Sequence, residues 1–198
     1  MRKYTLPLLT MAALSLAAPA AAQFSDSYKF LEAVRKKDGN AVTDALAEPG
    51  STLINTRDVT SGETALHIVT KRRDLAWMEF LIGKGANVNL RDSKGGTPLV
   101  LATNANFTEG VELLVGKNAR LDESNNAGET PLITAVHNRN TGMMRILLKA
   151  GADPDRADNS GRSARDYAKL GGGSLLLEIE TNAKPKGGDK AKTFGPKF

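Results

Sequence analysis

The chain has 198 residues, no cysteine and a formal net charge of +5. Without cysteine it can form no disulfide, no zinc–thiolate centre, no thiol-based active site and no lipid anchor of the bacterial lipoprotein type. The positive charge is concentrated in Arg2 and Lys3 and in five lysines after Thr181, so the region between the two ends is close to neutral. The basic balance therefore does not indicate a nucleic-acid-binding domain.

Residues 1–22 are typical of a secretory signal. A charged start is followed by a short apolar run over residues 6–18 and by small residues that end at Ala22, where we expect cleavage. The alternative is an uncleaved membrane anchor, which would need roughly 20 apolar residues. Pro7 and Pro19 also argue against it. We expect an exported chain with no membrane span after cleavage, and the lack of cysteine suits a bacterial periplasm.

A divergent first unit follows at residues 28–60. Apolar residues at helical spacing predict one helix around residues 30–34 and another around residues 42–46. The segment 55–58 matches 89–92 at a step that is one residue longer than the step between later units. One extra residue is therefore expected in the loop just after residue 58. The unit would close the N-terminal end of a stack, where a more polar outer face is typical.

Three full units then occupy residues 61–93, 94–126 and 127–159. Two separate markers keep one constant step of about 33 residues, and such self-similarity at a fixed period strongly indicates a repeat array. The first marker reads GETALH, GGTPLV, GETPLI and, in a worn form, GRSARD; it begins at Gly62, Gly95, Gly128 and Gly161. The second marker begins at Gly85, Asn118 and Gly151.

Each unit has the signals of two short helices. A hydroxyl residue can cap the first helix (Thr64, Thr97, Thr130 and Ser163). Pro98 and Pro131 follow at the first helical position, where the missing N–H costs nothing. The second helix should end at the glycine or asparagine of the second marker, which tolerates left-handed geometry. Gly110 and Gly142 lie near the start of second helices; they either delay the helix or allow close approach.

The last unit, residues 160–180, departs from the pattern. Arg165 stands where the other units place a leucine, and three glycines at 171–173 interrupt the second helical segment. We expect a C-terminal cap with a short second helix, in which Leu175, Leu176 and Ile179 close the core. Residues 181–198 are rich in lysine, glycine and proline and are expected to be a disordered basic tail. Phe194 and Phe198 are either a partner anchor or part of that loose tail.

The period, the Thr-Pro-Leu segment and the Gly-Ala-Asp/Asn segment resemble the ankyrin repeat over roughly residues 28–180, and we take residues 23–180 as one domain. The resemblance implies an all-α solenoid of helix pairs in which a β-turn finger projects from each unit. Fingers and first helices would line a concave groove that binds another protein. The groove positions expected to contact a partner are Thr60, Glu63, Lys71, Arg72, Arg91, Lys94, Gly96, Asn104, Glu129, His137 and Asn138.

Two basic clusters, at residues 35–37 and 71–73, lie at the ends of neighbouring first helices. With Arg57, Arg91 and Lys94 they would form a positive patch for a partner with an acidic surface. The alternative is an ordinary solvated face, since aspartates are interspersed at residues 38, 58, 74 and 92.

The sequence offers little for catalysis or metal binding. His67 occupies the place where the ankyrin family normally has a structural histidine. His137 has no second histidine at ligand spacing. Nucleophile, phosphate-loop and metalloprotease motifs do not occur. We therefore expect no catalytic residues, no metal site and no cofactor.

The leading hypothesis is a monomeric, non-enzymatic module that binds a partner protein through its groove. A second hypothesis is an accessory or immunity-type protein that stabilises or inhibits one specific exported enzyme, by analogy with exported ankyrin proteins of Gram-negative bacteria. An enzyme and a nucleic-acid-binding protein are the remaining classes, and nothing in the sequence favours them.

Overall fold

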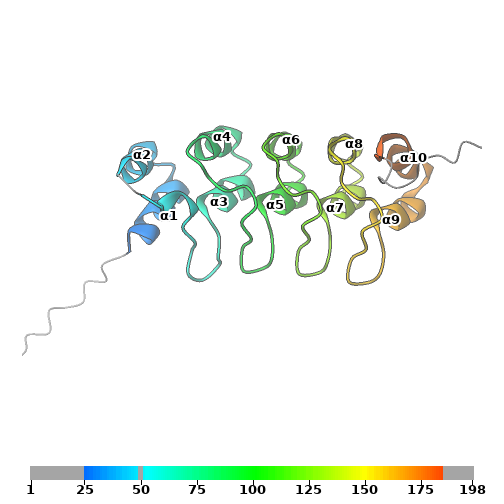
Figure 1. Cartoon of the computed structure of the whole chain (residues 1–198), viewed down its shortest axis with the longest axis horizontal. Helices are drawn as coiled ribbons and strands as arrows, with labels where there is room; N and C mark the ends of the chain where they lie inside the picture. Colours follow the sequence, from blue (N-terminus) through cyan, green and yellow to red (C-terminus); the bar gives the residue numbers. More distant parts are fainter. Residues whose placement is uncertain (1–24, 49–50, 185–198) are drawn as a thin grey trace, which may run out of the picture.

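The computed structural model describes residues 25–48 and 51–184. Within these ranges it contains ten α-helices, one short 3-10 helix and a single β-bridge, between Ala157 and Ser163. The α-helices form five successive pairs that stack along one axis (Figure 1). The predicted all-α solenoid is confirmed. The predicted signal at residues 1–22 and most of the predicted tail, from residue 185 on, lie outside the described residues.

The helices lie in two rows (Figure 1). The inner row holds the first helix of each pair: α1 (Asp26–Lys36), α3 (Ala65–Lys71), α5 (Pro98–Asn104), α7 (Pro131–His137) and α9 (Ala164–Gly171). The outer row holds the second: α2 (Gly39–Ala47), α4 (Leu75–Gly83), α6 (Thr108–Gly116), α8 (Thr141–Ala150) and α10 (Gly173–Asn182). The 3-10 helix η1 (Leu53–Asn55) follows α2.

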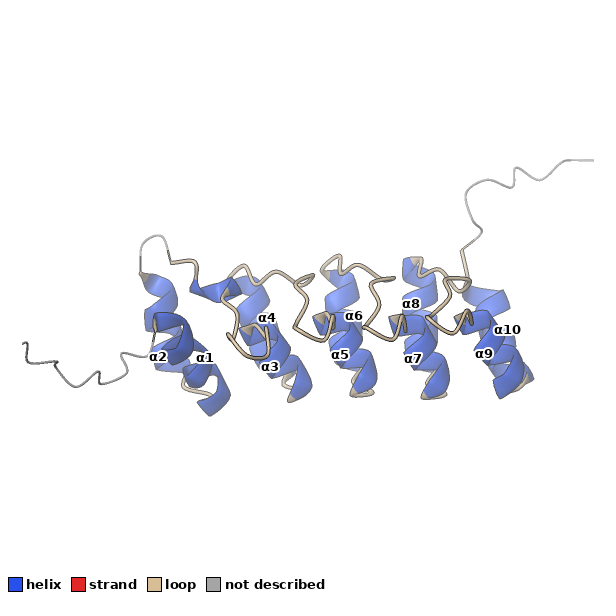
Figure 2. Ribbon diagram, turned by 90° about the horizontal axis from the view of Figure 1, so that it is seen from below, coloured by secondary structure: helices blue, strands red, loops and turns tan. Residues whose placement is uncertain are grey.

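A long loop leads from each outer helix to the next inner helix. These loops, which we call fingers, cover residues 56–63, 90–96, 123–129 and 156–162. They project beyond the inner row, on the side away from the outer helices (Figures 1 and 2). The first finger is one residue longer than the others. The Asp58 N–H is bonded to the carbonyl of Glu63, five residues on, whereas the Asp92 N–H is bonded to that of Gly96, four residues on. The predicted extra residue is confirmed.

The inner helices begin as the sequence predicted. Pro98 and Pro131 are the first residues of α5 and α7. The Thr97 and Thr130 hydroxyls accept hydrogen bonds from the N–H groups of Val100 and Ile133, at 3.3 and 3.2 Å. These bonds satisfy backbone donors that a helix start leaves free. The sequence did not point to the caps of the outer helices, which include Asp74 on α4 and Asn140 on α8.

The outer helices also end where predicted. Gly85, Asn118 and Gly151 have φ angles of +91°, +60° and +112°, and only such left-handed geometry turns the chain toward the next finger. A late start at Gly110 is wrong, because α6 already begins at Thr108. A Cβ on Gly110 would lie 2.4 Å from the Phe107 ring, so this glycine permits close packing instead.

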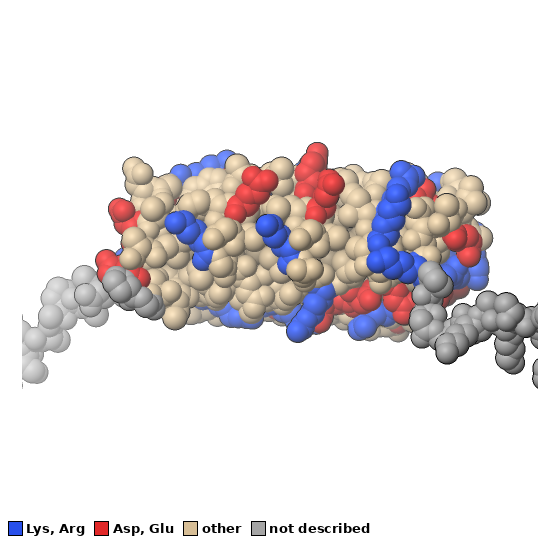
Figure 3. Space-filling view, turned by 45° about the horizontal axis from the view of Figure 1, so that its top comes forward, with Lys and Arg blue, Asp and Glu red and all other residues tan. Residues whose placement is uncertain are grey.

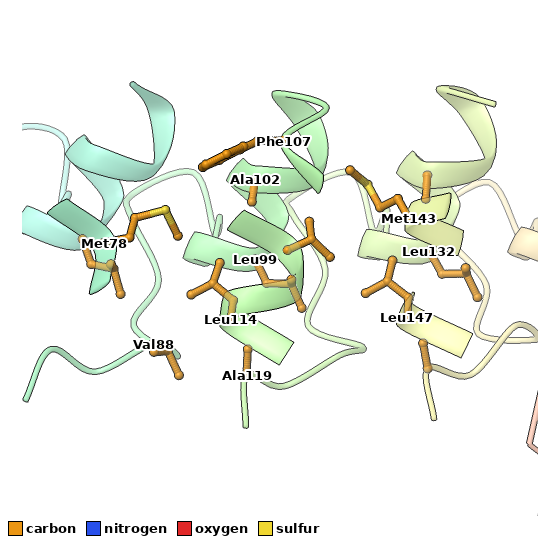
Figure 4. Close-up of a cluster of buried hydrophobic side chains, with 14 of the residues drawn as sticks. Met78, Val88, Leu99, Ala102, Phe107, Leu114, Ala119, Leu132, Met143 and Leu147 are labelled. Atoms are coloured by element: carbon orange, nitrogen blue, oxygen red, sulfur yellow. The ribbon is translucent and has the colours of Figure 1, made fainter. Parts of the chain in front are cut away.

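The core runs without interruption from one pair to the next. Leu66, Leu99 and Leu132 occupy the same position in three inner helices, and all three are fully buried. Leu99 and Leu132 point toward side chains of the outer helices, including Leu114 and Leu147 (Figure 4). A helix pair cannot bury its own apolar side, so each pair depends on its neighbours for a core.

The C-terminal end differs from the prediction in one respect. Helix α10 has ten residues, as many as α8, so the expected short helix is wrong. The φ of +116° at Gly172 turns the chain directly into α10, so the glycines do not shorten it. Leu175 and Ile179 are buried as predicted, and Leu176 is half-buried. The helix ends at Asn182, two residues beyond the predicted limit of 180.

Between residues 25 and 184, leaving out 49 and 50, no helix combines the length and the apolar composition that a bilayer crossing requires.

Candidate functional site

We call the space between the fingers and the inner helices the groove, and two positions recur beside it in each unit (Figure 1). One is the last finger residue before the helix cap: Glu63, Gly96, Glu129 and Arg162. The other is seven residues after the cap, toward the end of the inner helix: Lys71, Asn104, His137 and Leu170. Both sets recur once in every unit while their side chains differ from unit to unit. A contact or a shared depression places the first three pairs across the groove, and the repeat register places the fourth there.

Side chains close the space between the two positions in the first and third full units, residues 61–93 and 127–159. The Glu63 carboxylate lies 2.6 Å from the Lys71 ammonium. The Glu129 carboxylate lies 3.9 Å from Nδ1 of His137 and accepts a hydrogen bond from the Asn125 amide at 3.0 Å. His137 also packs edge-on against Tyr167, with ring centroids 4.4 Å apart.

The second full unit, residues 94–126, leaves this space open, because Gly96 has no side chain to fill it. A depression of about 390 Å³ is found there, which we call the notch. It contains three predicted groove residues, Lys94, Gly96 and Asn104. Its remaining lining residues come from the same unit and from the next finger: Asp92, Val100, Leu101, Asn125, Asn126 and Ala127.

Lys94 and Asn104 are exposed at the notch and have free polar groups. Within the described ranges, the Lys94 ammonium has no carboxylate within 4.0 Å and no hydrogen-bond acceptor. Only the Lys94 backbone is engaged: its N–H donates to the Asp92 carboxylate at 2.9 Å. The Asp92 carboxylate also accepts the N–H of Gly96 at 2.7 Å, which fixes the finger turn at the edge of the notch.

Gly96 itself is part of the framework. Its carbonyl accepts a hydrogen bond from Nε2 of the fully buried His67 at 3.1 Å, which joins one unit to the next. Nδ1 of His67 faces the Thr64 N–H, a donor, at 3.2 Å, so Nδ1 is the acceptor and Nε2 carries the hydrogen. Burial lowers the pKa of His67, which keeps the ring neutral. The structural role predicted for His67 is confirmed.

Two other predicted contact residues also tie neighbouring units together. The Arg72 guanidinium donates to the Val34 carbonyl at 2.9 Å and lies 5.8 Å from the Trp77 ring. The Asn138 amide donates to the Thr103 carbonyl at 3.0 Å. Both side chains bond backbone of the preceding inner helix, so they stabilise the stack and have fewer groups left for a partner.

The N-terminal basic clusters do not form a surface of uncompensated charge. Arg35 lies 2.8 Å from Asp58, and Lys37 and Arg72 lie 3.0 and 3.2 Å from Asp74. Asp58 holds its charge because Ser61 N–H and Arg35 lower its pKa well below the usual range. These pairs favour a mixed-charge face over a positive patch. The face that carries the outer helices also mixes both signs (Figure 3).

The two remaining finger positions differ in their bonding. Arg91 lies 2.5 Å from Glu123 of the next finger and donates to the Ser124 carbonyl, so it bridges two fingers. Thr60 is exposed near the tip of the first finger, and within residues 25–48 and 51–184 only its backbone N–H is bonded, to Asp58.

Four residues that the structure places at the groove or the finger tips were not predicted from the sequence. Leu101 and Asn126 line the notch. Val59 is fully exposed at the first fingertip, and Leu170 is exposed at the position equivalent to His137. Counting one repeat period onward from His137 would have found Leu170, and the extra residue of the first finger would have drawn attention to Val59.

The groove residues that the structure describes offer shape and hydrogen-bonding groups. No group of three or more His, Asp and Glu side chains among the described residues could hold a metal ion. Asp158, whose pKa is lowered to about 2 by the Ser160 hydroxyl and then by Tyr167, serves to close a finger turn.

Comparison with known protein families agrees with this geometry. A family model described as "Ankyrin repeats (3 copies)" matches residues 30–125. A second, "Ankyrin repeats (many copies)", matches residues 113–168. No curated protein matches the chain. Together the two family matches run from the first helix pair into the last, which is the extent of the helical stack. The chain therefore belongs to the ankyrin repeat family.

Proposed function

We propose that the chain is a non-enzymatic module that holds a partner protein in the groove between its fingers and inner helices. Ankyrin repeats are protein–protein interaction modules. The observation that carries the proposal is the pair of facing groove positions, which differ between units while the caps and core leucines beside them recur. A surface that presents different side chains from one repeated frame suits recognition of one particular partner.

The secretory-type features of residues 1–22 support a periplasmic location for this binding. A chain with no cysteine, acting there as a monomer, would need no oxidative folding. The partner could be a single exported enzyme that the chain stabilises or inhibits. That outcome would be recognised if the captured protein changes its activity or its thermal stability when the purified chain is added.

The proposal is tested by capturing partners from a periplasmic extract with the wild-type chain and with two charge variants of one unit. Asn104→Arg places a long charged side chain in the groove, where the Asn104 amide has no partner within the described residues. Lys117→Glu alters an exposed residue at the end of α6, in the outer row. We expect Asn104→Arg to lose the captured protein and Lys117→Glu to retain it. Equal recovery by all three chains would contradict groove binding.

A further inference from the structure

We infer that the notch at Gly96 receives an acidic side chain, a glutamate of an extended partner segment, and anchors that segment in the groove. This inference rests on the proposed function and adds the chemistry of the contact. The full units differ in the residue just before the helix cap. Glu63 and Glu129 fill the space between finger and inner helix, whereas the second unit, with Gly96, leaves it open.

The shape of the notch suits one side chain with an apolar stem. Its floor is formed by the buried Val100 and the half-buried Leu101. A volume of about 390 Å³ is near the lower limit for small-ligand sites. In the neighbouring units a glutamate side chain from the finger occupies the corresponding space. A glutamate of the partner would therefore fill the space at Gly96, as Glu63 and Glu129 of the chain itself fill the corresponding spaces in the neighbouring units.

The charges around the notch favour an acid over a base. Arg35, Lys71 and Arg91 each lie within 2.8 Å of a carboxylate, and the Arg57 guanidinium donates to the Arg91 carbonyl. The Lys94 ammonium has neither kind of partner in the described chain. Asp92 keeps its charge, but its Oδ1 accepts the backbone N–H groups of Lys94 and Gly96, and its carboxylate is not within 4.0 Å of the Lys94 ammonium. A basic side chain entering the notch would meet the Lys94 ammonium at its edge.

Two amides complete the site. The side chains of Asn104 and Asn126 line the notch, and neither amide has a hydrogen-bond partner within the described residues. Oδ1 of Asn126 would lie 2.5 Å from a Cβ on Gly95, so this amide sits directly against the finger backbone. Each amide can turn an N–H toward a carboxylate, which would accept charge-assisted hydrogen bonds beside the Lys94 ion pair.

A displayed library of random 12-residue peptides, selected on the purified chain, tests this chemistry. We expect the selected peptides to share a glutamate at one position. A synthetic copy of one peptide should bind roughly tenfold more weakly to Lys94→Glu. Its affinity for Lys117→Glu, which makes the same charge change in the same unit, should stay within about twofold of its affinity for the wild type. Replacing the shared glutamate by alanine should weaken binding to the wild type but not to Lys94→Glu.

Gly96→Glu provides a second variant, because it would fill the notch with the side chain that Glu63 and Glu129 supply in their units. A Cβ at Gly96 would meet Asp92 and Leu101 atoms at 3.2–3.3 Å, so the fold of this variant is checked by thermal unfolding. We expect peptide binding to be lost. If Gly96→Glu does not fold, Lys94→Glu alone decides, since Lys94 is exposed.

The inference is overturned if no acidic residue is enriched, if no peptide is selected, or if Lys94→Glu acts no more strongly than Lys117→Glu. Failure of the inference can be told apart from failure of the proposed function. If Lys94→Glu has no effect but His137→Ala weakens the peptides, the groove still binds and only the notch is wrong. If neither groove variant has an effect, both proposals fail.

Discussion

His67 shows how one buried side chain joins two repeats. It accepts the Thr64 N–H through Nδ1 and reaches the Gly96 carbonyl of the next unit through Nε2. We expect His67→Ala to lower the free energy of unfolding by about 2–4 kcal/mol, since it removes buried volume and leaves buried polar groups unpaired. Urea unfolding measures this. His137→Ala, at an exposed histidine, should change stability by about 0.5 kcal/mol or less, and an equal loss in both variants would contradict the account.

The same histidine should make stability depend on pH. Because burial lowers the pKa of His67, the unfolded chain binds a proton at a higher pH than the folded chain does. The folded state should therefore lose stability as the pH falls below about 6.5, the ordinary value for histidine. Unfolding curves recorded between pH 7.5 and 5 should show this loss in the wild type. In His67→Ala the decline should be smaller; an unchanged decline would assign it to other groups.

Asp122 places a partly buried charge at a position where other units have a neutral asparagine. Its carboxylate accepts the Asp153 N–H at 2.9 Å, where Asn55 and Asn89 use an amide oxygen for the equivalent bond to Asn87 and Arg120. Burial raises the pKa of Asp122, and the nearby Asp153 carboxylate adds to the rise. The folded state therefore favours the protonated form, and stability falls as the pH rises above about 4.

We expect Asp122→Asn to stabilise the chain by about 0.5–1 kcal/mol at neutral pH, because the amide keeps the hydrogen bond and removes the charge. The loss of the attraction to Arg156 works in the opposite direction and limits the gain. Thermal unfolding at pH 7.5 and at pH 3.5 tests this. The difference between variant and wild type should be present at the higher pH and nearly absent at the lower one. A variant that is less stable at pH 7.5 would contradict it.

Among the elements, helix α10 carries the clearest prediction. It packs against α8 and carries the fully buried Ile179, while Glu178 lies 2.9 Å from Arg145 on α8. Ile179→Ala should lower the free energy of unfolding by about 2–4 kcal/mol. Leu177→Ala alters a residue of the same helix that is 65% exposed and should cost about 0.5 kcal/mol or less. If both changes cost equally little, α10 does not seal the stack.

The elements also show what the sequence could and could not predict. Caps, first-turn prolines and the left-handed residues at 85, 118 and 151 are local signals, and they predicted the helix starts and ends correctly. The length of α10 was predicted wrongly, because it depends on packing against α8 rather than on its own glycines. The two interpretations of Gly110 were separated by the start of α6 at Thr108 and by the Phe107 ring beside the glycine, and both are visible only in the structure.

The groove residues were predicted less well than the fold, for a physical reason. The repeat register identifies which positions face the groove, and it placed Lys94, Gly96 and Asn104 together correctly. It cannot tell whether a side chain there is free or already bonded. Arg72 and Asn138 proved to bond neighbouring backbone, and most of the basic clusters proved to face carboxylates. Those partners come from adjacent units and are visible only in three dimensions.

At the scale of the whole molecule, the stack separates stability from recognition. The core leucines and the bonds between units hold the frame, and the facing groove positions are free to differ. Repeat stacks of this kind are stabilised mainly by contacts between nearest neighbours. Substitutions at exposed groove positions should therefore alter binding with little effect on folding, which is the condition under which a repeat protein can acquire one specific partner.

Site-specific photo-crosslinking in the cell that produces the chain tests groove binding most directly. A photoreactive side chain is placed at Thr60 or Leu170 along the groove, or at Leu177 on α10 in the outer row. Leu170 and Leu177 are matched, being 72% and 65% exposed on adjacent helices. We predict one discrete protein adduct from the groove positions and none from position 177. Adducts of the same protein from position 177 alone, or from all three positions equally, would contradict binding in the groove.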